Sequence, residues 1–107
     1  MAFYECMIIA RQELSPTAVE TLIKTFQKVI TDEKGKVHKT EFWGLKDFAY
    51  RINKQKKGHY ILMELDTDPA PLLEMERQMR LHEDIVRFLT IKLDALSDAS
   101  KTVKEAA

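Results

Sequence analysis

The clearest hydrophobic pattern in the sequence lies between Ser15 and Gly35. Apolar residues recur there at intervals of three and four positions, namely Val19, Leu22, Ile23, Phe26, Val29 and Ile30. This spacing places them on one face of an α-helix, while the intervening charged and amide residues face water. Ser15 suits the N-cap and Pro16 the first helical position. Gly35 is expected to be the left-handed residue that ends the helix.

A second, shorter stripe follows Asp68 and Pro69, which repeat the cap and the proline of the first helix. It consists of Leu72, Met75 and Met79, with Leu73 beside it. Four other segments are rich in aromatic and branched residues and show no helical period, so we expect them to be strands. They span residues 3–10, 36–52 (with a bend or bulge at Gly44), 58–66 and 85–93.

The predicted order is therefore β-α-β-β-α-β. Right-handed crossovers place both helices on one face of a four-stranded antiparallel sheet, which is the α+β ferredoxin-like sandwich. The first and third strands take the centre, and Gln55–Gly58 is expected to form the hairpin connection. We assign residues 1–94 to this domain. Residues 95–107 carry only Leu96 and Val103 as sizeable apolar groups, so they are expected to be a disordered tail.

The alternation along the strands predicts which side chains the helices leave uncovered. The sets containing Cys6, Ile61 and Phe88 match the helix stripes best. The opposite face would carry Met7, Ile9, Leu62, Leu89 and Ile91. An exposed apolar patch of this size is unusual on a monomer, so it predicts a partner on or beside that face. The alternatives are a wrong phase for one strand, or a tail that folds back over the sheet.

Charge is balanced overall but uneven along the chain. There are 17 Lys and Arg against 17 Asp and Glu, yet the stretch from Lys46 to His59 holds five Lys or Arg and a single acid, Asp47. A two-stranded ribbon with a cationic end suits a polyanion such as RNA. The alternative is an ordinary polar hairpin, whose lysines only protect the edge of the sheet.

Catalytic and metal-binding patterns are missing from the sequence. There is no Gly-rich phosphate loop and no nucleophile with a base and an orienting group. His38, His59 and His82 fall on three different elements without the spacing of metal ligands, so we expect no metal and no cofactor. The single cysteine, Cys6, is expected to be a core residue in a reducing compartment. No signal peptide or membrane span is expected, which predicts a cytosolic protein.

Two other functions are compatible with the same topology. An acylphosphatase-type enzyme needs an arginine-containing phosphate loop after the first strand, where this chain has Arg11-Gln12-Glu13-Leu14 without a glycine. A ligand-sensing regulatory domain is the other alternative.

The central stretch also carries a family resemblance. The run Gly44-Leu45-Lys46-x-Phe48-Ala49-Tyr50-x-Ile52-x-Lys54, followed by Gly58-His59-Tyr60, resembles the bacterial small-subunit ribosomal protein S-six (S6) family. The resemblance covers about residues 1–93. It implies a non-catalytic, cytoplasmic ferredoxin-like domain on the platform of the small ribosomal subunit. It also implies binding to the central domain of the small-subunit ribosomal RNA, in a heterodimer with ribosomal protein S-eighteen (S18).

The resemblance implies two sets of candidate site residues, one for RNA and one for the partner protein. The candidates for phosphate contacts are Lys46, Arg51, Lys54, Lys56, Lys57, Arg87 and Lys92. The candidates for the contact with the partner protein are Trp43, Met7, Ile9, Tyr60, Leu62, Leu89 and Ile91. Trp43 could equally be a packing residue at the sheet edge. The chain departs from the family at Arg51, where many members have proline, and at Asp47, where a basic residue is common.

Overall fold

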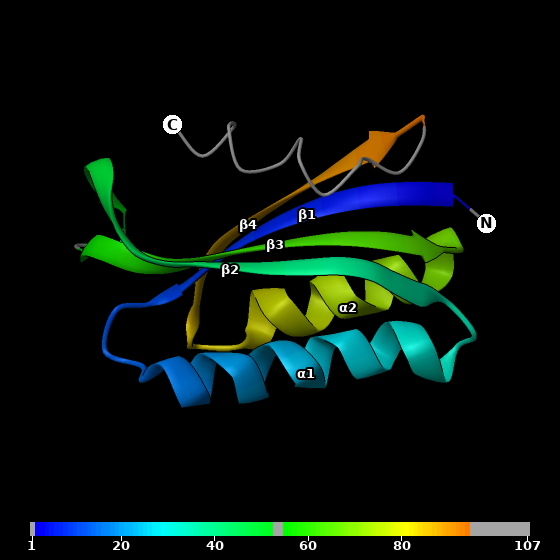
Figure 1. The fold of residues 1–107 in the computed structure, drawn as a ribbon, viewed down its shortest axis with the longest axis horizontal. Helices are drawn as coiled ribbons and strands as arrows, with labels where there is room; N and C mark the ends of the chain where they lie inside the picture. The colour runs from blue at the N-terminus through cyan, green and yellow to red at the C-terminus, as the bar shows by residue number, and fades with distance from the viewer. Residues whose placement is uncertain (1, 53–54, 95–107) are drawn as a thin grey trace.

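The computed structural model describes residues 2–52 and 55–94, and the side chains of these residues except 48–52 and 55–56. The elements follow one another as β1 (Ala2–Arg11), α1 (Pro16–Asp32), β2 (Lys36–Ile52), β3 (Gln55–Thr67), α2 (Pro69–Leu81) and β4 (Ile85–Leu93). The strands form one antiparallel sheet in the order β2-β3-β1-β4, and both helices lie against one face of it (Figure 1). The predicted ferredoxin-like sandwich and its two central strands are confirmed.

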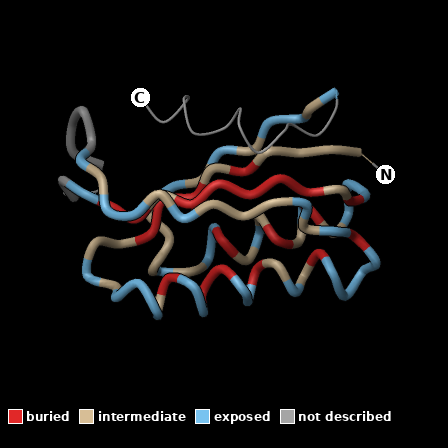
Figure 2. Tube along the Cα trace, in the orientation of Figure 1, coloured by how far each residue is buried: buried red, intermediate tan, exposed pale blue. Residues whose placement is uncertain are grey.

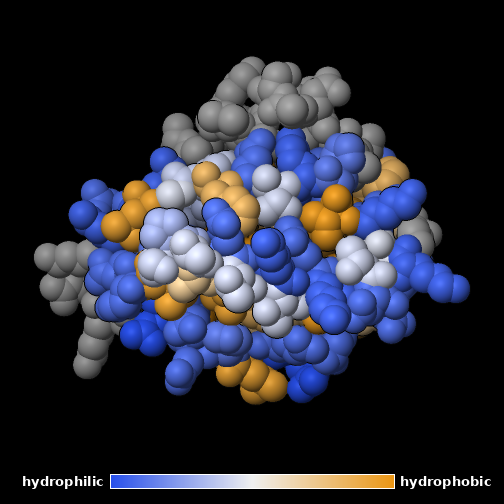
Figure 3. Space-filling view, turned by 60° about the horizontal axis from the view of Figure 1, so that its bottom comes forward, coloured by the Kyte–Doolittle hydropathy of each residue, from blue (hydrophilic) through white to orange (hydrophobic). Residues whose placement is uncertain are grey.

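The hydrophobic core lies between the sheet and the helices. Alternate residues of β1 and β3 meet the apolar stripes of α1 and α2 there, and buried positions concentrate on the central strands and the inner sides of the helices (Figure 2). Cys6 and Ile61 are in this core and Phe88 packs against it, which confirms the predicted phase of the strands. The helix side of the surface is mostly hydrophilic, with separate apolar spots (Figure 3).

The two ends of α1 differ in how well the sequence predicted them. Ser15 is the N-cap, and its Oγ accepts a hydrogen bond from the Ala18 N–H at 3.1 Å. At the other end the left-handed residue is Lys34, with φ of 68°, so its assignment to Gly35 was wrong. The Lys34 N–H donates to the Thr31 carbonyl and the Gly35 N–H to the Ile30 carbonyl, at 3.1 and 3.0 Å. These two bonds form a Schellman motif.

Gly35 is required for space and not for its dihedral angles. A Cβ at this position would lie 2.7 Å from Ile30 Cγ2 and 2.9 Å from Thr67 Oγ1, and both of those residues are fully buried. The end of α1 therefore approaches the end of β3 more closely than any side chain at position 35 would allow.

Replacing Lys34 with glycine should stabilise the protein. Lys34 is exposed and holds a backbone conformation that costs a non-glycine residue about 1 kcal/mol. We expect Lys34→Gly to raise the free energy of unfolding by about 0.5–1 kcal/mol, measured by urea denaturation. The same substitution at the exposed, extended Lys36 is the control and should be neutral or destabilising. A loss of stability in Lys34→Gly would contradict this account of the helix end.

The hairpin between β2 and β3 is longer than predicted. Gln55–Gly58 is part of β3, because Ile52 pairs with Gln55 and Asp47 with Lys57. Gly58 is buried within the sheet, opposite Lys46 on one side and Arg11 on the other. The predicted connection was therefore wrong: a glycine after a run of lysines resembles a turn, but here it stands where β3 is flanked by two strands.

The helix-free face, defined as the side of the sheet opposite the helices, is less exposed than predicted. Ile9 and Leu62 are buried and Met7 is half-buried, whereas Leu89 and Ile91 are 56% and 48% exposed. Ile9 and Leu62 lie on central strands with a neighbouring strand on each side, while Leu89 and Ile91 lie on the edge strand β4. The expectation of five bare apolar side chains is thus corrected to two, at one edge.

Candidate RNA and partner-protein interface

The cationic candidates on the hairpin lie along β2 and β3. Lys46 is half-buried on β2, and Lys57 is exposed on β3, where its Nζ lies 3.9 Å from Asp47 Oδ1 on the paired strand. An ion pair this exposed is weak, so Lys57 can exchange Asp47 for another anion at little cost. The side chains of Arg51 and Lys56, and the whole of Lys54, lie outside the described residues.

The two cationic candidates on β4 are separated from the hairpin and from each other. Arg87 pairs with Ile9, which pairs with Tyr60, which in turn pairs with Gly44 on β2. Three strand spacings therefore separate Arg87 from β2, a distance of about 14 Å. Lys92 pairs with Tyr4 near the other end of the sheet. The four candidates whose side chains the structure describes therefore do not form one cluster; they are Lys46, Lys57, Arg87 and Lys92.

Arg87 and Lys92 also lie on opposite faces. Phe88 packs against the core and the Thr90 hydroxyl donates to Cys6 Sγ at 3.5 Å, so the even-numbered residues of β4 face the helices. Lys92 continues this set, whereas Arg87, Leu89 and Ile91 belong to the helix-free face. Of the two, only Arg87 can act on the same side as the predicted partner contacts.

Carboxylates occupy the middle of the helix-free face. Glu64 is fully buried, and the Nζ of Lys39 lies 3.8 Å from both Glu64 Oε2 and Glu41 Oε2. Glu5 stands directly opposite Glu64 across β1 and β3. The alternation along each strand puts Glu5 on the same side as Met7 and Glu64 on the same side as Leu62, but the mutual position of the two carboxylates depends on the register, which the sequence does not reveal.

Trp43 lies at a bulge in β2, as the glycine after it had suggested. Phe42 pairs with Ile61 and Gly44 with Tyr60, so Trp43 is the additional residue, and Gly44 has φ of 82°. A Cβ on Gly44 would meet no atom within 4 Å, so the glycine is needed for its backbone conformation. Trp43 Nε1 donates to Glu41 Oε1 at 2.9 Å, which orients the half-buried indole beside the acidic middle of the helix-free face.

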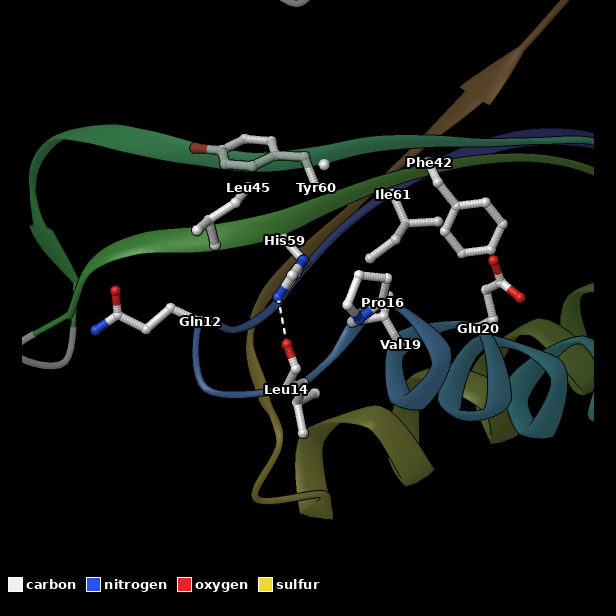
Figure 4. Close-up of a pocket in the computed structure, with 11 residues that line it drawn as sticks. Gln12, Leu14, Pro16, Val19, Glu20, Phe42, Leu45, His59, Tyr60 and Ile61 are labelled. Atoms are coloured by element: carbon white, nitrogen blue, oxygen red, sulfur yellow. Dashed lines mark hydrogen bonds between the residues drawn. The ribbon is translucent and has the colours of Figure 1, made fainter.

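An apolar groove that sequence reasoning missed lies on the other side of β2. It has a volume of about 400 Å³ and opens between the start of α1 and the bulged part of β2 (Figure 4). Its main apolar residues are Leu14, Pro16, Val19, Phe42 and Leu45. Phe42 and Leu45 pair with Ile61 and His59, which share the helix side of β3. In a regular strand, residues three apart face opposite sides, and the bulge places these two on the same side. Gly44 was the signal for this arrangement.

Other reactive groups are engaged in the fold. Burial raises the pKa of the Cys6 thiol to about 11, which makes it a core residue as predicted. The acylphosphatase alternative would need Arg11. Its Nε lies 3.4 Å from Glu13 Oε1 and its Nη1 lies 3.5 Å from Asp84 Oδ1, so both acids already engage the guanidinium.

Within residues 2–52 and 55–94 no three His, Cys, Asp or Glu side chains are grouped to hold a metal ion. No helix in the described part of the chain is long and apolar enough to span a membrane.

The topology and the placement of these residues define the class of the protein, a small ferredoxin-like domain. Its helix-free sheet face has an acidic middle and an apolar edge. Comparison with known proteins identifies the family within this class. The family model described as Ribosomal protein S6 matches residues 3–92.

Relatives and a solved structure agree with that match. Small ribosomal subunit protein bS6 of Methylobacterium sp. (strain 4-46) is 53% identical over 96 residues, covering 90% of this chain and 72% of the relative. The protein of the same name from Rickettsia bellii (strain RML369-C) is 47% identical over 98 residues, covering 92% and 82%. The crystal structure of 30S ribosomal protein S6 from Thermotoga maritima aligns with a TM-score of 0.80 at 31% identity, covering 86% and 87% of the two chains.

The chain belongs to the ribosomal protein S6 family. It is a structural, non-enzymatic constituent of the cytoplasmic small ribosomal subunit, which confirms the family resemblance and excludes the acylphosphatase-type enzyme.

Proposed function

We propose that this chain binds the central domain of the small-subunit ribosomal RNA on the platform, as a heterodimer with S18. The family membership supports a role within a ribonucleoprotein particle. Binding to both RNA and S18 is supported by the separation of two surfaces. One is the cationic hairpin, and the other is the helix-free face with its acidic middle and apolar edge.

The hairpin is the surface suited to RNA. Lys57 is exposed and Lys46 half-buried there, and Arg51, Lys54 and Lys56 belong to the same stretch of sequence. Contacts from such residues to phosphate give orientation and salt-dependent affinity without reading the bases. Specificity must therefore come from the shape of the RNA and from the companion protein.

The helix-free face is the surface suited to S18. Leu89 and Ile91 are exposed there, next to a row that contains Glu5 and Glu64. Exposed apolar side chains suit the core of a protein interface, so a protein is a better occupant of this face than RNA. Trp43 at the edge of the same face is the aromatic anchor that such an interface would use. Met7 and Tyr60 are half-buried beside them and complete the proposed contact, whereas Ile9 and Leu62 are buried and support it from below.

Lys54→Ala combined with Lys56→Ala should weaken RNA binding and flatten its salt dependence. Each lost phosphate contact removes about 0.7–0.9 from the slope of log K against log salt, so the pair should remove about 1.4–1.8. The measurement is filter binding of the heterodimer to central-domain RNA between about 50 and 200 mM salt.

The matched control for this pair is Lys24→Ala combined with Lys28→Ala. Both lysines are exposed on the outer side of α1, so the control should leave the slope unchanged. Neither pair should change the melting temperature. If the hairpin pair alone lowered the melting temperature, or left the slope intact, these lysines would serve the fold and not the RNA contact.

A further inference from the structure

We propose that a cleft between the end of α1 and the start of α2 binds a short basic segment of another protein, one in which Lys or Arg stands next to an apolar residue. The proposal goes beyond the binding of RNA and S18. The cleft lies on the helix side of the sheet, at the end of the molecule opposite the hairpin ends of β2 and β3 (Figure 1). It therefore shares no residue with the two surfaces proposed above.

The interhelix cleft, as we name it, has room for an apolar side chain. Its volume is about 380 Å³, and the apolar residues that line it are Val29 on α1 and Ala70 and Pro71 on α2. Val29 and Pro71 are half-buried, while Ala70 is exposed. Because the alanine side chain is small, the two helices leave a hollow there, and an occupant would remove its apolar lining from water.

Two unpaired carboxylates lie on the α1 side of the interhelix cleft. Asp32 and Glu33 are exposed, and their carboxylates make no hydrogen bond or ion pair with any described residue, Lys28 and Lys34 included. The last turn of α1 carries no basic residue. Since the C-terminal end of a helix is partially negative, acidic residues there destabilise the free chain. Residues that break such a rule without a compensating contact are candidates for a functional site.

A third carboxylate lines the cleft from α2, and it is already compensated. Arg77 donates two hydrogen bonds to Glu74, at 3.0 and 2.8 Å, and Gln78 donates a third at 2.8 Å. These bonds lower the pKa of Glu74 to about 2, so the group is charged at neutral pH. Because Arg77 offsets that charge, the uncompensated charge of the cleft is at its α1 side.

Charge and shape together select a basic protein segment as the occupant. Free carboxylates repel the phosphates of RNA. A metal ion is a poor occupant as well, because no three His, Cys, Asp or Glu side chains are grouped to hold one in the part of the chain that the structure describes. A Lys or Arg next to an apolar residue satisfies both parts of the cleft. The cation reaches Asp32 and Glu33, and the apolar residue covers Val29 and Pro71.

The test is selection of phage-displayed random heptapeptides on the immobilised full chain, followed by fluorescence anisotropy with a labelled synthetic copy of the enriched peptide. We expect an enriched class that combines Lys or Arg with an apolar residue. Asp32→Asn combined with Glu33→Gln should weaken its binding about two- to thirty-fold, the size of two exposed ion pairs. The matched control is Glu20→Gln combined with Glu83→Gln. It removes the same charge at exposed positions outside the cleft, so binding should be unchanged.

Two further measurements separate a shaped site from a general attraction of charge. Ala70→Trp fills the hollow without changing the charge, so it should weaken peptide binding at least about ten-fold. Ala70 is exposed, so this variant should keep the wild-type melting temperature. In the free chain, Asp32→Asn combined with Glu33→Gln should raise the urea midpoint, because two negative charges leave the negative end of α1.

The absence of an enriched basic class would overturn the inference. So would equal weakening by the cleft pair and the control pair, or binding that Ala70→Trp leaves intact. A lower urea midpoint for Asp32→Asn combined with Glu33→Gln would also overturn it, since these acids would then serve the fold. Joint RNA binding with S18 is measured separately by filter binding, so the failure of either proposal leaves the other standing.

Discussion

RNA affinity should be weak for this chain alone and should rise at least about 100-fold when S18 is bound first. The chain has 17 cationic and 17 acidic side chains, and its candidate phosphate contacts are divided between the hairpin and β4. About four to six such contacts give little affinity at physiological salt. Joining two modest RNA-binding surfaces in one rigid body raises the effective concentration of the second, which strengthens binding by about 10²–10⁴.

Filter binding with central-domain RNA at about 150 mM salt, with and without S18, measures this difference. Leu89→Asp combined with Ile91→Asp should remove the increase while leaving the weak binding of the chain alone. Leu73→Asp combined with Leu81→Asp is the matched control, because these leucines are exposed on α2, on the other side of the sheet. Equal affinity with and without S18 would reject the cooperative account.

Phe26→Ala should cause the largest loss of stability of the substitutions considered. Phe26 is buried in the middle of the α1 stripe, and its ring meets the His82 ring edge-on with centroids 5.9 Å apart. Truncation removes a buried aromatic side chain and leaves a cavity between α1 and the sheet. The expected loss is about 3–5 kcal/mol in the free energy of unfolding, measured by urea denaturation.

The matched control is Phe42→Ala. Phe42 is also a phenylalanine of the sandwich, but it is half exposed at the edge strand, so its truncation should cost less than about 1.5 kcal/mol. Similar losses in both variants would show that the core does not depend on the α1 stripe as described.

Several features of the candidate site could be derived from patterns that act over a few residues. The bulge at Gly44 followed from a glycine within a strand, and the helix-free set from the alternation of two. The hairpin was harder, since Gly58 resembles a turn residue, but the register pairs it with Lys46 and Arg11 within β3. The groove between α1 and β2 was missed because its walls come from elements that are distant in the sequence.

The sequence by itself determined the element order, the two helix stripes and the phase of the strands. These depend on periods of 3.6 and 2, which each segment carries locally. Only the tertiary structure decided that Lys34 takes the left-handed conformation, while Gly35 fits between Ile30 and Thr67. It also decided that Ile9 and Leu62 are buried. These outcomes depend on which strands are neighbours and on how closely a helix approaches the sheet, and contacts between distant residues set both.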